Sequence, residues 1–193
     1  MPRPARQLRA DARRNRERLL AAALNLFTTS KAEVTLSAVA QAAGVGIGTL
    51  YRHFPTRDAL VEGLYRHEVE RLSDAAPKLL EKMPPEAALE EWLRRYATLI
   101  AAKRGLSEAL KSIFEPGSET TAYSRERMTR AITRLIDAAA RSGAIRTDVA
   151  PQDVLLAIAA STWSFAGDRD WRERAARVLR LVLDGLRYGA GKR

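Results

Sequence analysis

The stretch TLSAVAQAAGVGIGTLYRHFPTRDALV, residues 35–61, decides the fold, because it predicts two short helices joined by a tight turn. Thr35 is a suitable N-cap for a helix over Leu36–Ala43, since its hydroxyl can accept a hydrogen bond from a free first-turn N–H. Gly44 follows at the point where a helix would end in the left-handed conformation, which glycine adopts without steric penalty. A second helix is predicted over Ile47–Phe54 and ends before a proline.

Two helices that meet steeply across such a turn have three steric requirements. They need a small side chain where they approach, a glycine in the turn, and apolar residues that lock the second helix onto the first. Ala40 and Gly44 meet the first two requirements, and Val39, Val45 and Leu50 meet the third. The stretch therefore predicts a helix-turn-helix.

Helical periodicity extends over nearly the whole chain of 193 residues, and no alternating pattern typical of a strand appears. Seven further helices are predicted, over Asp11–Thr28, Arg57–Leu80, 86–104, Leu106–Phe114, Thr121–Ser142, Pro151–Phe165 and Trp171–Tyr188. The predicted fold class is all-α with about nine helices, a three-helix N-terminal domain preceding a larger helical domain. The predicted divisions are a basic arm over 1–10, the helix-turn-helix domain over 11–65, the larger domain over 66–188 and a tail over 189–193.

The charge balance predicts a polyanionic partner. Lys and Arg number 33 against 23 Asp and Glu, which gives a formal net charge of +10. Residues 1–65 carry 10 basic and 5 acidic side chains, so this third of the chain is about twice as charge-dense as the rest. Nucleic acid and an anionic membrane surface are both compatible with this positive charge. For the arm, the alternative is that its arginines form an ordinary solvated surface and bind no partner. The arm and the next turns carry Arg3, Arg6, Arg9, Arg13, Arg14, Arg16 and Arg18.

Several function classes are disfavoured. The chain has no cysteine, which excludes disulfides and thiolate chemistry. It shows no apolar signal core and no apolar run long enough to span a bilayer, so we expect a cytoplasmic protein. With only two histidines and no Gly-rich phosphate loop, metal-ligand spacing or serine elbow, we expect no enzyme, metal or cofactor. The sequence does not exclude an active site made of carboxylates alone.

The stretch closely resembles the DNA-binding domain of the tetracycline-repressor (TetR) family, over about 50 residues from Arg14 to Leu64. The residues that carry the resemblance are Thr35, Ala43-Gly44-Val45, Thr49-Leu50-Tyr51-Arg52-His53-Phe54 and Thr56-Arg57-Asp58-Ala59-Leu60. The resemblance implies a homodimer that places two recognition helices in successive major grooves of a near-palindromic DNA operator. It further implies a repressor that a small ligand releases from DNA, by favouring a spacing of the recognition helices that mismatches the grooves.

The resemblance also implies which side chains contact DNA. Phosphate contacts, which fix register, are expected from Thr35, Thr49, Tyr51, His53 and Arg57. Base contacts are expected from Gly46, Ile47, Gly48 and Arg52, a sparse set because the glycines offer only their backbone. Part of the discrimination is therefore expected from DNA shape, with arginines of the arm in the minor groove. For Tyr51 and His53, the alternative to a phosphate contact is a role in the core or in capping a helix.

In the family, two C-terminal helices of each subunit form a four-helix dimer bundle, and residues 151–165 and 171–188 fit that arrangement. Residues 154–160 are apolar all round, as expected of a helix that meets its own core on one side and a partner on the other. A helix buried wholly within a monomer is the alternative.

A ligand pocket for a small apolar or amphipathic effector is also expected, with an ordinary core as the alternative, because aromatic residues at helical spacing also build cores. The candidate lining is Trp92, Tyr96, Leu99, Phe114, Tyr123, Met128, Trp163 and Phe165. The alternative function for the whole chain is a helical interaction protein, or a basic amphipathic membrane-surface protein, whose helix-turn-helix no longer reads DNA. The sequence does not identify the effector, the operator or the regulated genes. It also does not decide between repression and activation, or give the number of dimers per operator.

Overall fold

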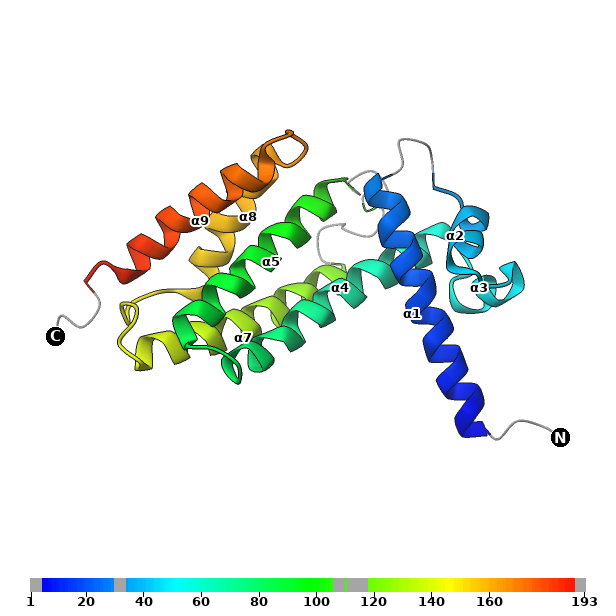
Figure 1. Ribbon diagram of the computed structural model, residues 1–193, viewed down its shortest axis with the longest axis horizontal. Helices are drawn as coiled ribbons and strands as arrows, with labels where there is room; N and C mark the ends of the chain where they lie inside the picture. Colours follow the sequence, from blue (N-terminus) through cyan, green and yellow to red (C-terminus); the bar gives the residue numbers. More distant parts are fainter. Residues whose placement is uncertain (1–4, 30–33, 106–109, 111–117, 190–193) are drawn as a thin grey trace. The chain divides into compact units, whose positions relative to one another are not determined.

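The computed structural model describes residues 5–29, 34–105, 110 and 118–189, and its regular structure there is helical throughout (Figure 1). This confirms the predicted all-α class. The described helices are α1 (Ala5–Thr29), α2 (Leu36–Ala43), α3 (Ile47–His53), α4 (Arg57–Leu80), α5 (Pro85–Gly105), α7 (Glu119–Arg141), α8 (Pro151–Phe165) and α9 (Trp171–Arg187).

Most predicted helix bounds agree with the structure to within two residues, and the start of the first helix is the main exception. It begins at Ala5, so much of the segment predicted as a basic arm is helical. Alanine, arginine, glutamine and leucine all favour a helix, and a preceding proline suits a helix start. The recognition helix ends at His53, because Phe54 before a proline takes an extended conformation. The helix predicted over Leu106–Phe114 lies, apart from Leu110, outside the described residues.

The chain divides into two compact units. The first comprises residues 1–67 and 108–113, and the second comprises residues 68–107 and 114–193. Helix α4 contributes its first eleven residues to the first unit and the remainder to the second. The predicted boundary after residue 65 therefore lies two residues from the division.

The first unit is built on α1, which contacts both α2 and α3 (Figure 1). Helix α2 also contacts α3, so the three helices enclose a small apolar core. The first part of α4 also contributes to the core of this unit, whose almost fully buried apolar side chains are Leu19, Leu20, Ala23, Val39, Ala40, Leu50, Phe54, Leu60, Val61 and Leu64. Burial of these side chains is the main source of stability for the helix-turn-helix.

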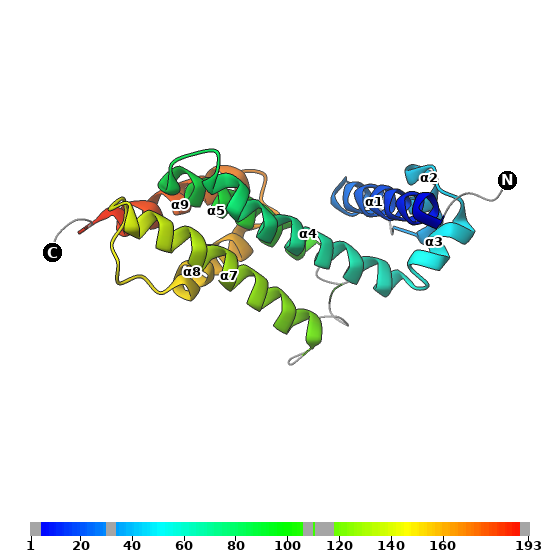
Figure 2. The same ribbon diagram turned by 90° about the horizontal axis from the view of Figure 1, so that it is seen from below.

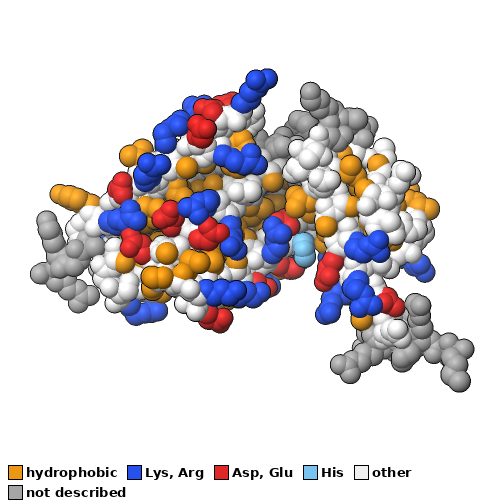
Figure 3. Space-filling view, in the orientation of Figure 1, with side chains coloured by type: hydrophobic (Ala, Val, Ile, Leu, Met, Phe, Trp, Pro, Cys, Tyr) orange, Lys and Arg blue, Asp and Glu red, His pale blue; other side chains and the backbone are white. Residues whose placement is uncertain are grey.

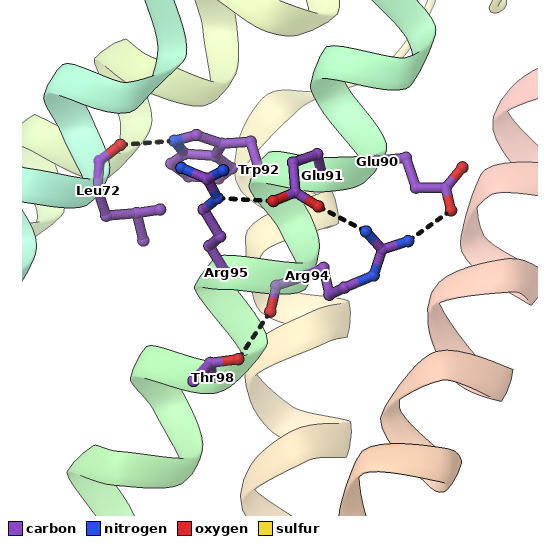
Figure 4. A network of polar contacts seen from close by, with 7 residues as sticks. All are labelled: Leu72, Glu90, Glu91, Trp92, Arg94, Arg95 and Thr98. Carbon is purple, nitrogen blue, oxygen red and sulfur yellow. Dashed lines mark hydrogen bonds and ion pairs between the residues drawn. The ribbon is translucent and has the colours of Figure 1, made fainter. Parts of the chain in front are cut away.

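The second unit is organised around α5, which contacts α7, α8 and α9 (Figures 1 and 2). Trp92 at its centre is fully buried, stacks on Tyr96 at 5.6 Å between ring centroids, and donates its indole N–H to the Leu72 carbonyl at 2.8 Å (Figure 4). On the outer side of α5, Arg94 and Arg95 pair with Glu91. Among the described residues, no helix is both long and apolar enough to cross a bilayer.

Candidate nucleic-acid interface

The turn between α2 and α3 is fixed by local backbone chemistry. The Thr35 hydroxyl accepts a hydrogen bond from the Ala38 amide at 3.2 Å and caps α2. Gly44 ends α2 with φ +61° and ψ +39°, the left-handed conformation that favours glycine. The Val45 amide then donates to the Ala40 carbonyl at 3.0 Å, which closes the helix end. These contacts confirm the predicted N-cap and the predicted glycine turn.

Helix α3 buries one face and exposes the other. Leu50 is fully buried against the first unit's core, whereas Ile47 is 44% exposed and Tyr51 is 51% exposed. Gly46 and Gly48 are exposed as well, and a methyl group added at either position would meet no atom within 4 Å. All four residues expected to contact bases are thus exposed, the fourth being Arg52.

Two side chains expected to contact DNA already bond to each other. The Arg52 guanidinium donates to the Thr49 hydroxyl at 2.9 Å, one helical turn away. This hydrogen bond holds the arginine along the helix surface, with its remaining N–H groups available to a groove or a phosphate.

Arg57 lies partly inside the unit rather than wholly on its surface. Its Nε donates to the Val34 carbonyl at 3.4 Å, and its guanidinium lies over the Phe27 ring at 5.6 Å. The residue is therefore a structural link between α1, the start of the helix-turn-helix and α4. The sequence predicted only a phosphate contact here, because a partner 23 residues away leaves no local signal.

Phe54 joins the end of α3 to two other helices. Its ring is almost fully buried, with the Arg16 guanidinium of α1 at 5.2 Å from the ring centroid. On α4, a methyl group added at Gly63 would come within 2.7 Å of the Phe54 ring, so only a glycine allows this close approach. Sequence reasoning named Arg16 only as one of the N-terminal arginines and missed Gly63, although a glycine inside a long helix signals a close contact.

His53 lies between two arginines at the end of α3 and is half-buried. Burial lowers the pKa of His53, and the charges of Arg16 and Arg52 lower it further. The imidazole is therefore neutral near pH 7 and offers one N–H donor and one acceptor. A neutral ring beside two permanent cations suits a phosphate contact that is made by a hydrogen bond rather than by its own charge.

Arginines also cover the exposed face of α1. Figure 3 shows Lys and Arg side chains gathered over the N-terminal half of this helix. Arg13 and Arg14 are both exposed; Arg13 lies 3.8 Å from Glu17, and Arg14 forms a hydrogen-bonded ion pair with Asp11 on the same helix. Arg18 donates to the Gly44 carbonyl at 3.4 Å, which connects α1 to the turn. The basic face of the first unit thus continues from the recognition helix into its neighbours.

A first testable consequence concerns Gly63. Gly63→Ala should lower the free energy of unfolding by about 1–3 kcal/mol, because the new methyl group overlaps the Phe54 ring. Gly48→Ala is the matched control, since its methyl group meets no atom within 4 Å and alanine favours a helix by about 0.5–1 kcal/mol. Urea unfolding followed by circular dichroism measures both. A Gly63→Ala variant as stable as the parent would show that Phe54 is not held this closely.

The structure separates the residues expected to line a ligand pocket. Trp92, Tyr96, Met128 and Phe165 are buried, Leu99 and Tyr123 are half-buried, and Trp163 is 42% exposed. Phe114 lies outside the described residues. Trp92 and Tyr96 stack on each other in the core, whereas Trp163 is partly exposed, so the members of this set have different surroundings.

Comparisons with known proteins agree with this architecture. Residues 19–64 match the family described as "Bacterial regulatory proteins, tetR family", and residues 84–188 match "Transcriptional regulator SbtR-like, C-terminal domain". A solved TetR transcriptional regulator from Streptomyces coelicolor is 44% identical, with 89% of this chain and 98% of that chain covered and a TM-score of 0.81. A TetR regulatory protein from Mycobacterium vanbaalenii is 35% identical, with 93% and 99% covered and a TM-score of 0.73.

A curated relative aligns over a shorter length. It is the HTH-type transcriptional regulator EthR of Mycolicibacterium smegmatis, 30% identical over 118 residues. The alignment covers 58% of this chain and 54% of EthR. The chain therefore spans about half the length of the curated relative that it matches.

Proposed function

This chain belongs to the tetR family of bacterial regulatory proteins and is a transcriptional regulator rather than an enzyme. From this premise we propose that it represses transcription as a homodimer bound to a near-palindromic operator. A small-molecule effector releases it. The observation that carries DNA binding is the orientation of α3, which buries Leu50 and exposes Ile47, Tyr51 and Arg52. A regulator that binds genomic DNA works in the bacterial cytoplasm, which is the compartment we propose.

The contacts of the exposed face divide by chemistry. Thr49, Tyr51 and His53 offer hydroxyl or imidazole donors, which suit phosphate oxygens and set the register of the protein on the duplex. Ile47 suits a thymine methyl group, and Arg52 suits the O6 and N7 atoms of guanine. Thr35 and Arg57 retain donor groups for phosphates beyond the internal hydrogen bonds that they make. Gly46 and Gly48 allow the backbone to approach the base edges.

A substitution pair tests this division. Arg52→Ala should relax specificity at one operator position and remove about 1–3 kcal/mol of discrimination against the wrong base there. Tyr51→Phe removes a donor from the same helix face and should weaken all sequences by a similar factor. Competition binding on duplexes that differ at single positions measures both effects. Equal losses on every sequence for both variants would contradict the role given to Arg52.

Selection of bound duplexes from a random pool tests the function as a whole. We expect a near-palindromic motif whose half-sites are about one helical turn apart or somewhat more, with binding that weakens steeply as salt rises. The absence of any enriched motif, together with no duplex binding at low ionic strength, would favour the alternative of an interaction protein with a vestigial helix-turn-helix. Retention on anionic vesicles but not on duplex DNA would instead indicate a membrane-surface protein.

We place the dimer contact on α8 and α9, which contact each other within the second unit. Helix α8 buries Leu155 and Ile158 but leaves Leu156 67% exposed. Helix α9 buries Leu179 and Leu183 but leaves Leu181 72% exposed. Each helix thus carries an exposed apolar side chain besides its buried ones, as a helix does when it meets a partner on its second side.

Support for an effector site comes from an apolar groove between α5 and α9. It has a volume of about 250 Å³ and is lined by Arg94, Ala97, Thr98, Trp171, Arg172, Ala175, Ala176 and Leu179. Apolar side chains form most of this lining, and two arginines stand among them. Such a lining suits an apolar or amphipathic molecule of modest size. The proposed site therefore lies on residues other than the aromatic set that the sequence suggested.

A further inference from the structure

A second groove in the same unit has a different chemistry. It lies between the C-terminal part of α4 and α7, which run beside each other in Figures 1 and 2, and has a volume of about 190 Å³. Its lining is Ser73, Asp74, Ala76, Pro77, Arg127, Arg130, Ala131 and Arg134. Three of these eight side chains are arginines and one is acidic, so the lining carries a formal charge of +2.

Helix geometry explains why the three arginines share one wall. Arg127, Arg130 and Arg134 are separated by three and four residues, the spacing that puts side chains on the same face of a helix. Ala76 and Ala131 are both buried, and their small side chains leave the space between the two helices open. The groove is thus a small hollow with cationic groups along one side.

The acidic groups nearby neutralise this wall only in part. Asp74 is 62% exposed, and its carboxylate is 3.7 Å from Arg127, longer than a strong hydrogen-bonded ion pair. Arg127 also lies over the Tyr123 ring at 5.3 Å, which fixes its position. Arg130 pairs with Glu126, and both side chains are exposed. Within the described part of the chain, Arg134 has no ion-pair partner.

We propose that the groove between α4 and α7 binds the compact anionic group, a phosphate or a carboxylate, of a small molecule. Guanidinium groups present N–H donors in a planar fork that matches the oxygen atoms of both anions. The volume suits such a group and is too small for a whole ligand of drug-like size. The remainder of the molecule extends outward from the open groove.

This site is separate from the proposed DNA contact and from the apolar groove. None of its lining residues belongs to α3 or to the groove between α5 and α9. Binding is measured without DNA, so its failure is distinguishable from a failure of the proposed repressor function.

Titration calorimetry on the full chain at constant ionic strength tests the proposal, with pyrophosphate in one arm and succinate in the other. We expect saturable binding of one anion per chain, and the tighter arm identifies phosphate or carboxylate as the preferred group. Arg130→Gln and Arg134→Gln should each weaken binding by roughly three- to ten-fold, because each removes one charge-assisted contact at an exposed site. Arg125→Gln is the matched control, since it is exposed on α7, carries the same charge change and does not line the groove.

The direction in which one further substitution changes anion affinity distinguishes a specific site from general attraction of anions to a basic protein. Asp74→Asn should tighten binding of the preferred anion by roughly two- to five-fold, because it removes a like charge from the groove and releases Arg127. Unchanged or weaker binding by Asp74→Asn would overturn the proposal. So would equal losses in Arg125→Gln and Arg134→Gln, or no saturable binding of either anion by the parent chain.

Discussion

Replacing Leu156 and Leu181 together with Asp should convert the proposed dimer into monomers and abolish binding to a selected operator at concentrations that saturate the parent protein. Each leucine contributes about 1.5–3 kcal/mol when an interface buries it, and a symmetric interface buries each residue twice. Introducing carboxylates at the same positions adds a desolvation cost. We expect dimerisation weaker by about 6 kcal/mol or more, which is on the order of 10⁴-fold.

This result is interpretable because the subunit itself should stay folded. Leu156 and Leu181 are 67% and 72% exposed in the single chain, so their replacement leaves the core packing intact. Sedimentation velocity measures the oligomeric state, and circular dichroism with urea unfolding checks the fold. Ala122→Asp, an exposed change on α7, is the control and should remain dimeric. A double variant that is folded and still dimeric would show that the dimer contact lies elsewhere.

Trp92→Ala should lower the free energy of unfolding of the second unit by about 3–5 kcal/mol. The substitution removes the largest fully buried side chain, its stacking on Tyr96 and the hydrogen bond to the Leu72 carbonyl. The cavity it creates lies on α5, the helix that contacts α7, α8 and α9, so several helices lose packing at once. Losses of this size are a large fraction of the stability of an ordinary domain.

Two milder variants each remove one hydrogen bond of the same unit. Trp92→Phe retains most of the apolar volume but removes the indole N–H that the Leu72 carbonyl accepts in addition to its bond within α4, and should cost about 0.5–1.5 kcal/mol. Tyr123→Phe removes a hydroxyl that donates to Glu70 at 2.8 Å in a half-buried place, and should cost about 0.5–1.5 kcal/mol. Urea unfolding gives all three values. A loss of less than 1 kcal/mol for Trp92→Ala would show that α5 is not the centre of the core.

The features that the sequence predicted correctly depend on neighbours within a few residues. The hydroxyl of Thr35 and the backbone freedom of Gly44 determine where α2 begins and ends, and both act over three or four residues. The exposed face of α3 follows from the position of Leu50, because a helix that buries one side chain exposes those half a turn away. Local chemistry therefore sufficed for the helix-turn-helix.

The features that the sequence missed depend on partners that are distant along the chain. Arg57 bonds to Val34 and Arg16 lies over Phe54, pairings that no helical spacing encodes. Trp163 has the residue type of a pocket lining but is 42% exposed, since the packing of α8 decides which of its faces is buried. A cluster defined only by aromatic type therefore included residues with different surroundings. The arginine-lined groove needed the structure for the same reason, because its two walls are about 50 residues apart.

The two glycines beside Ile47 have a consequence for evolution and engineering. Positions 46 and 48 face open space, so a larger side chain at either one can extend toward a base without repacking the three-helix core. New sequence preference is thus accessible through single codon changes at the start of α3, while the larger unit stays as it is. Such a scaffold can diverge to bind different operators without a change in its larger unit.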